Sequence, residues 1–108
     1  MTKFEDRERA FEAHFALEQD QLFRAMVRRD KLFGLWAAER MGLPAAEADM
    51  YAKGLIDYDI EHPGDEDILE RVADDLAARG VHADLPQLRV ELDRLHAVAK
   101  SEILGQQA

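Results

Sequence analysis

The chain has 108 residues, of which 47% are hydrophobic and 34% are charged, and it carries a formal net charge of −9 and no cysteine. A chain of this length predicts one domain, and its acidic balance argues against nucleic acid as a main partner, because phosphate contacts need a basic face. The lack of cysteine excludes disulfides and thiolate metal sites. No apolar run approaches the roughly 18 residues of a membrane span, and the first residues lack the apolar core of a signal peptide, so we expect a cytoplasmic protein that is not membrane-embedded.

The charge is unevenly distributed along the chain. Residues 21–43 carry five basic and two acidic side chains, whereas acidic residues dominate on both sides of this segment. The simpler interpretation is that the basic segment faces the acidic remainder of the chain and stabilises the fold. The alternative is an exposed patch for an acidic partner or a phosphate group, formed by Arg24, Arg28, Arg29 and Lys31.

The first predicted helix runs from about residue 4 to Met41. At the α-helical period its apolar side chains fall on one face, and they are Phe4, Phe11, Phe15, Leu22, Met26, Phe33 and Trp36. Gly42 is expected to end the helix in the left-handed conformation, and Pro44 prevents its continuation. No segment alternates with the period of a strand.

Three further helices are predicted, at residues 46–60, 65–79 and 84–104. We expect Asp65 to cap the second of these and Gly80 to end it. Asp84 and Gln87 have the spacing of a capping box at the start of the last one. Because the connections are short, the fold class is all-α, a four-helix bundle whose first helix covers residues 20–41.

A length argument separates the N-terminal part of the first helix from the bundle. A continuous helix over residues 4–41 would be about 57 Å long, whereas a compact chain of this size has a diameter of roughly 34 Å. The first residues must therefore overhang, fold back or be disordered in the free protein. We divide the chain into a mobile, partner-binding segment at residues 1–19 and a bundle at residues 20–108.

The N-terminal segment has the pattern of an amphipathic helix that binds in the groove of a partner. Phe4, Phe11 and Phe15 are the expected anchors. Charged side chains beside them would set the register through ion pairs with the partner, namely Arg7, Glu8, Arg9 and Glu12. The two other interpretations of the stripe are a frayed tail and assembly of a homo-oligomer.

The sequence offers no motif for catalysis or for a metal. An EF-hand loop starting at Asp57 would need glycine at position 62 and glutamate at position 68, where the chain has His62 and Ile68. The four histidines lack metal-ligand spacing, and no phosphate-binding glycine motif or nucleophile elbow occurs. We therefore expect a protein that is not an enzyme and requires no metal or other cofactor.

Two stretches resemble a known family. They are "FEDRERAFEAHF" at residues 4–15 and "FRAMVRRDKLFGLWAAERMGL" at residues 23–43. Together they resemble the ζ subunit of alphaproteobacterial F-type ATP synthases, which is an ATPase inhibitor subunit. The run "GLWAAE" is the most specific part, and "GDED" at residues 64–67 agrees as well. Asp30 departs from the family pattern, in which asparagine is expected.

The resemblance implies a four-helix bundle with a mobile inhibitory segment, which here would be residues 1–19. That segment would become helical in a catalytic interface of the enzyme's head, beside the rotor, and block ATP hydrolysis. The implied partners are the α, β and γ subunits of the head, and the protein would be a monomer when free, peripheral to the inner membrane. Weak nucleotide binding is also implied, although the chain has no standard nucleotide motif.

Two functions from other classes stay open at this point. One is a small helical bundle that binds or senses a nucleotide through the basic stretch of the first helix. The other is a homo-oligomeric structural protein built through the apolar stripe. Both would use residues that the inhibitor hypothesis also uses, so the sequence does not separate them.

Overall fold

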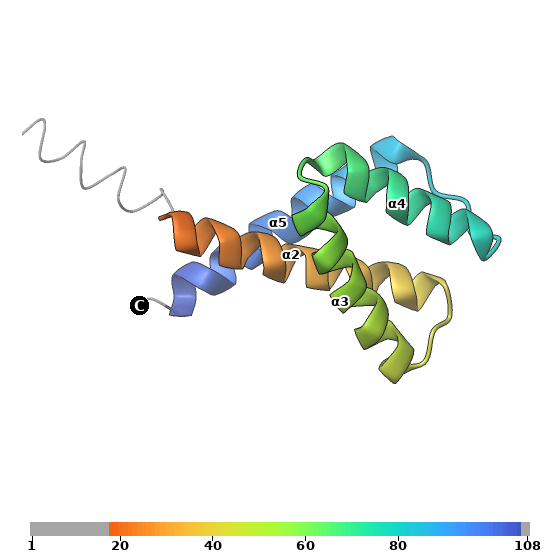
Figure 1. The fold of residues 1–108 in the computed structure, drawn as a ribbon, viewed down its shortest axis with the longest axis horizontal. Coiled ribbons are helices and arrows are strands. Elements are labelled where there is room, and N and C mark those ends of the chain that lie inside the picture. Colours follow the sequence, from red (N-terminus) through yellow and green to blue (C-terminus); the bar gives the residue numbers. More distant parts are fainter. Residues whose placement is uncertain (1–17, 107–108) are drawn as a thin grey trace, which may run out of the picture.

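A computed structural model describes residues 18–106, and these residues form four helices and no strand. The helices are α2 (Gln19–Arg40), α3 (Ala45–Glu61), α4 (Asp65–Ala78) and α5 (Leu85–Gln106). Figure 1 shows that α5 runs lengthwise along α2 in the opposite direction, while α3 crosses α2 obliquely and α4 lies beyond α3. The described part of the chain is the all-α, four-helix fold that the sequence predicts.

The first described helix begins later than the apolar stripe in the sequence. Glu18 is extended, with φ −68° and ψ 164°, and α2 starts at Gln19. The Gln21 side chain accepts a hydrogen bond from the backbone N–H of Glu18 at 2.9 Å, which satisfies one of the free donors at this helix end. The sequence predicts a helix that begins near residue 4, and residues 4–17 of that helix lie outside the described part.

The later helix boundaries follow from local chemistry. Gly42 and Gly80 both have positive φ, and the residue after each returns a backbone hydrogen bond to the preceding helix, as the sequence predicts for left-handed C-caps. Asp84 accepts a hydrogen bond from the Gln87 backbone at 2.9 Å, as expected of a capping box. The expectation for Asp65 was wrong, because the cap position is Gly64 and Asp65 is the first helical residue.

The core lies where α2 meets the other three helices. Phe33 on α2 is fully buried and stacks against Trp36, with ring centroids 5.7 Å apart. Leu22 belongs to the same predicted stripe but is 47% exposed, because the N-terminal end of α2 extends past α3 and α4. The apolar centre also includes Leu55, Ile68, Leu69, Val72, Leu76, Leu88, Leu92 and Leu95.

The crossing of α2 and α3 depends on the absence of a side chain at Gly34. A Cβ atom at this position would lie 2.7 Å from the Cα of Ala52 and 3.0 Å from its Cβ. Two helix backbones can approach this closely only where one residue is glycine. Gly34 therefore sets the distance between α2 and α3, and with it the positions of the polar groups that meet beside the crossing.

Candidate functional site

A buried arginine lies in the middle of α2 and joins three helices. The Arg29 side chain is 8% exposed, and its guanidinium contacts the carboxylates of Asp30 on α2 at 3.0 Å, Asp59 on α3 at 3.2 Å and Asp65 on α4 at 3.1 Å. Burial opposes the positive charge, but the three carboxylates outweigh it, so the pKa of Arg29 is raised above its usual range. We call these four residues the Arg29 cluster.

Asp30 is the most deeply buried member of the Arg29 cluster, with a fully buried side chain. Its Oδ1 accepts a hydrogen bond from the Arg29 Nε, whereas no donor among the described residues reaches its Oδ2. Burial raises the pKa of Asp30 to about 8, the nearby Asp59 side chain acts in the same direction, and the charge of Arg29 opposes both. At neutral pH the uncharged form of Asp30 is therefore favoured.

Helix α5 supplies the fourth side of the cluster. Arg89 approaches Asp65 at 3.5 Å and also pairs with Glu66, so the acidic first turn of α4 is held to α5. The Nδ1 atom of His96 is buried and has no hydrogen-bond partner among the described residues. Burial lowers the pKa of His96, and the charge of Arg29 adds to this effect. Polar contacts around Arg29 thus connect all four helices.

A pocket of about 330 Å³ opens beside the Arg29 cluster. Its walls are mostly apolar and come from α2, α3 and the turn between α3 and α4. Arg29, Asp59 and Asp65 form its polar side, and each of these is already engaged in an ion pair. The pocket is lined by Phe23, Met26, Arg29, Asp59, Ile60, Pro63, Gly64 and Asp65.

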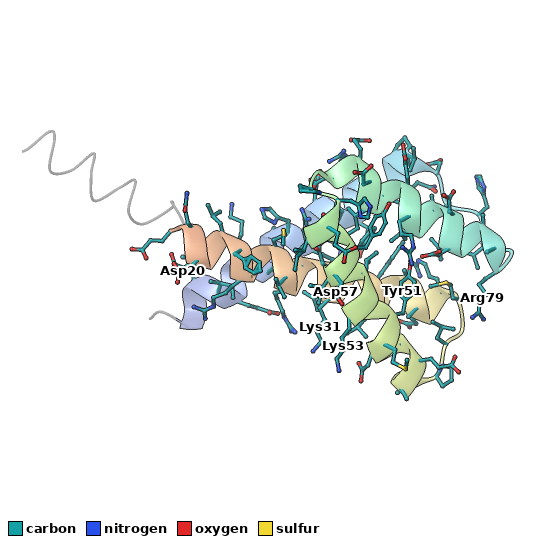
Figure 2. The ribbon with its side chains drawn as sticks, viewed as in Figure 1. Asp20, Lys31, Tyr51, Lys53, Asp57 and Arg79 are labelled. Carbon is teal, nitrogen blue, oxygen red and sulfur yellow. The ribbon has the colours of Figure 1, made fainter. Side chains whose placement is uncertain are left out.

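The four basic residues that the sequence groups into one patch lie on different sides of α2. Arg24, Arg28 and Lys31 line a second groove of about 450 Å³ between α2 and the end of α5, together with Phe23, Val27 and Ile103. Arg28 pairs with Glu102 on α5 at 2.6 Å, and Lys31 is exposed (Figure 2). Arg29 instead faces the interior. Arg28 and Arg29 both pair with acidic groups of the fold. For these two residues the structure agrees with the interpretation that the basic segment faces the acidic remainder of the chain.

The predicted partner-binding residues belong neither to the Arg29 cluster nor to the two grooves described above. Phe4, Arg7, Glu8, Arg9, Phe11, Glu12 and Phe15 lie outside the described residues. Their assignment to a partner-binding segment stays a prediction. Within residues 18–106, no group of three or more histidine, aspartate or glutamate side chains is placed to hold a metal ion. None of the described helices is long and apolar enough to cross a membrane.

Sequence reasoning did not find the carboxylates that surround Arg29. Asp59 lies seven residues after Ala52 and four after Leu55, both of which are buried, so it shares their helix face. Asp30 likewise lies three residues before buried Phe33. A charged residue on an otherwise apolar helix face is the available signal, because such a group is buried only when it is paired.

Taken together, the described residues form a small all-helical protein in which a buried ion cluster, rather than a catalytic or metal centre, connects the helices. The chain matches the family of ATPase inhibitor subunit zeta over residues 1–102, and it belongs to that family. The family's name assigns its members to the regulation of an ATPase as an inhibitory subunit, which is a non-catalytic role.

The chain is also similar to a solved structure. A protein structure determined by solution NMR is 36% identical to this chain, with a TM-score of 0.67, and the match covers 78% of this chain and 95% of that one. No curated protein matches the chain. The similarity to an experimental structure supports the arrangement of the helices described above.

Proposed function

We propose that this protein inhibits ATP hydrolysis by an F-type ATP synthase through residues 1–19. In this mechanism the segment folds as a helix in a catalytic interface of the enzyme's head, beside the rotor, where its bulk blocks the rotation that accompanies hydrolysis. Phe4, Phe11 and Phe15 anchor it in the interface. Arg7, Glu8, Arg9 and Glu12 set its register through ion pairs, and the bundle remains outside.

The observation that carries the proposal is the extent of the family match. It begins at residue 1 and continues to residue 102, so it includes the whole proposed inhibitory segment as well as the bundle. The extended backbone of Glu18 supports a boundary at this point, because α2 begins only at Gln19. A segment that folds on binding must offset its own ordering entropy with a few strong contacts, and three phenylalanines on one face suit that need.

The bundle would anchor the inhibitory segment, residues 1–19, through α2. Contacts of the Arg29 cluster attach α2 to α3 and α4, and Arg28 attaches it to α5 through Glu102. A firmly held α2 gives the segment a fixed point of departure at Gln19. The proposed partners are the α, β and γ subunits of the head, and the free protein is proposed to be a monomer in the cytoplasm, peripheral to the inner membrane through the synthase.

The test is an ATPase assay of the cognate enzyme with the full chain and with a variant carrying Phe11→Ala and Phe15→Ala. We expect the double variant to inhibit at least tenfold more weakly, because losing two buried aromatic anchors costs more than the roughly 1.4 kcal/mol that a factor of ten requires. Met50→Ala is the matched control, since Met50 is an apolar side chain that is 72% exposed on α3 and is not part of residues 1–19.

Two outcomes of this assay would contradict the proposal. One is equal inhibition by the full chain and the double variant. The other is a large fall in the melting temperature of the double variant, which would assign both rings to the core of the bundle. Removing residues 1–19 should likewise abolish inhibition while the described helices keep their circular dichroism.

Nucleotide binding is the second candidate function, and the groove between α2 and α5 favours it. Three cationic side chains, Arg24, Arg28 and Lys31, line this groove beside apolar surface. Titration with ATP, followed by amide chemical shifts, tests the idea. Saturable shifts on these residues below millimolar ATP would support a nucleotide site, and shifts that are absent or spread over the whole chain would exclude it. No cofactor is required for the proposed inhibition.

A further inference from the structure

We propose that Asp30 and Asp59 form a buried proton-binding site that holds α2 to α3 and makes the stability of the bundle fall as the pH rises through neutrality. One proton, shared between the two carboxyl groups, is the ligand. The site is separate from the proposed inhibitory segment, and the inference does not depend on the proposed function.

The buried charges around Arg29 do not balance. The side chains of Asp30 and Asp59 are 0% and 3% exposed, and both contact the same guanidinium, which also contacts Asp65. Arg89, the other cation at this junction, is shared between Asp65 and Glu66. With every carboxyl group ionised, one buried negative charge has no matching cation, and burying an uncompensated charge is strongly unfavourable.

One oxygen atom of Asp30 lacks a hydrogen-bond donor. Oδ2 of Asp30 is buried and accepts no hydrogen bond from residues 18–106, which is rare for a buried polar atom. A carboxylate can only accept, but a protonated carboxyl group gains an O–H donor. We assign Asp59 as the acceptor for that donor, because its carboxylate contacts the same guanidinium as Asp30 and its presence also raises the pKa of Asp30. One proton therefore removes the excess charge and satisfies the unpaired atom.

The charged and titratable groups around the Arg29 cluster come from all four helices. Arg29 on α2 and Asp59 on α3 act on Asp30 itself, whereas Asp65 on α4 and His96 on α5 lie near Arg29. The folded pKa of Asp30 is raised above the ordinary 3.8, so its contribution to stability is complete at low pH and is lost as the pH rises towards about 8.

His96 acts with the opposite sign and over a different range. Its pKa is lowered from 6.5 in the folded state, so its contribution to stability is lost as the pH falls below 6.5. At pH 6.5 about half of the unfolded chains carry a proton on His96, and this fraction falls as the pH rises further. The remaining effect of His96 is at most about twofold in the unfolding equilibrium constant, so a comparison with a variant that lacks only the Asp30 carboxyl group isolates the effect of Asp30.

The experiment compares urea unfolding of the full chain and of Asp30→Asn at about pH 6.5 and about pH 9. Asparagine has nearly the shape of aspartic acid, carries N–H donors where the protonated carboxyl group carries an O–H, and cannot lose a proton in this pH range. We expect the unfolding equilibrium constant of the parent chain to rise about thirtyfold over this range, relative to the change in the variant, because one proton bound only by the folded state gives up to tenfold per pH unit. Asp57→Asn is the control, since Asp57 is exposed on the same helix as Asp59 (Figure 2), and it should behave like the parent.

Equal pH dependence in the parent chain and in Asp30→Asn would overturn the proposal. If the variant fails to fold, the side-chain carboxyl carbon of Asp30 in the unmodified chain can be titrated by NMR. A midpoint above pH 6.5 supports the proton site, and a midpoint near the ordinary value for aspartate refutes it. Neither measurement involves the ATP synthase, so failure here would leave the proposed inhibition untouched.

Discussion

The close approach of α2 and α3 makes Gly34 the most informative position for a test of the fold. Gly34→Ala adds one methyl group, 2.7 Å from the Cα of Ala52. The obstacle is backbone and not the end of a flexible side chain, so α3 must move away from α2. Overpacking of this kind costs about 1–3 kcal/mol, and we expect the upper part of that range.

The helix propensity of alanine offsets part of this cost. Replacing a helical glycine by alanine gains about 1 kcal/mol. The net loss in the free energy of unfolding is therefore about 2 kcal/mol, which lowers the melting temperature by about 10 °C in a domain of this size. Thermal and urea unfolding followed by circular dichroism at 222 nm measure both quantities.

Gly54→Ala is the matched control, because Gly54 is also inside a helix and nothing lies within 4 Å of a Cβ atom built there. Only the propensity term applies at this exposed position, so the variant should be about 0.5–1 kcal/mol more stable than the parent chain. The two identical substitutions thus have opposite expected signs. Equal stabilisation by both would refute the close crossing of α2 and α3.

Two further predictions concern polar contacts. Arg29→Met should lower the free energy of unfolding by about 3–5 kcal/mol, measured by urea titration, because it leaves buried carboxyl groups without their cation. Arg28→Met breaks the half-exposed ion pair with Glu102 and should cost no more than about 1 kcal/mol in the same titration. Comparable losses in both would contradict the assigned burial. Tyr51→Phe removes the 2.7 Å hydrogen bond from the hydroxyl to Asp75 and should cost about 0.5–1.5 kcal/mol. An unchanged urea midpoint would contradict a stabilising role for this hydrogen bond between α3 and α4.

The Arg29 cluster also bears on how the bundle could serve a regulatory role. It lies at the middle of α2, about three turns from the end at which the proposed inhibitory segment joins the helix. A single buried guanidinium makes contacts on α2, α3 and α4, so one substitution disturbs three helices at once. Variants in this cluster should therefore be assessed for folding before any loss of inhibition is assigned to the segment.

Much of the secondary structure could be predicted from local sequence signals. Gly42 and Gly80 end helices in the left-handed conformation because a side chain at these positions would be strained, and this constraint is local. Asp84 and Gln87 form the predicted capping box for the same reason, since both partners lie within one turn. Asp65 was misassigned because the sequence signal for a cap does not distinguish it from the glycine before it.

The Arg29 cluster could not be predicted from local signals. The sequence placed Arg29 in a basic patch with Arg24, Arg28 and Lys31, because net charge along the chain does not show which side of a helix a residue occupies. Its three partners come from positions 30, 59 and 65, and the latter two are brought near only when α3 and α4 pack on α2. Whether a charged side chain is buried, and with which group it pairs, depends on contacts between helices that are distant in the sequence.

The sequence by itself determined the helical class, the ends of most helices and the family, because each depends on periodic patterns, local caps or a specific string of residues. Only the tertiary structure decided that Gly34 admits the backbone of α3 and that Asp30 and Asp59 face one guanidinium. Both are consequences of the distance and angle between helices, which arise from side-chain packing across the whole core and not from any local segment.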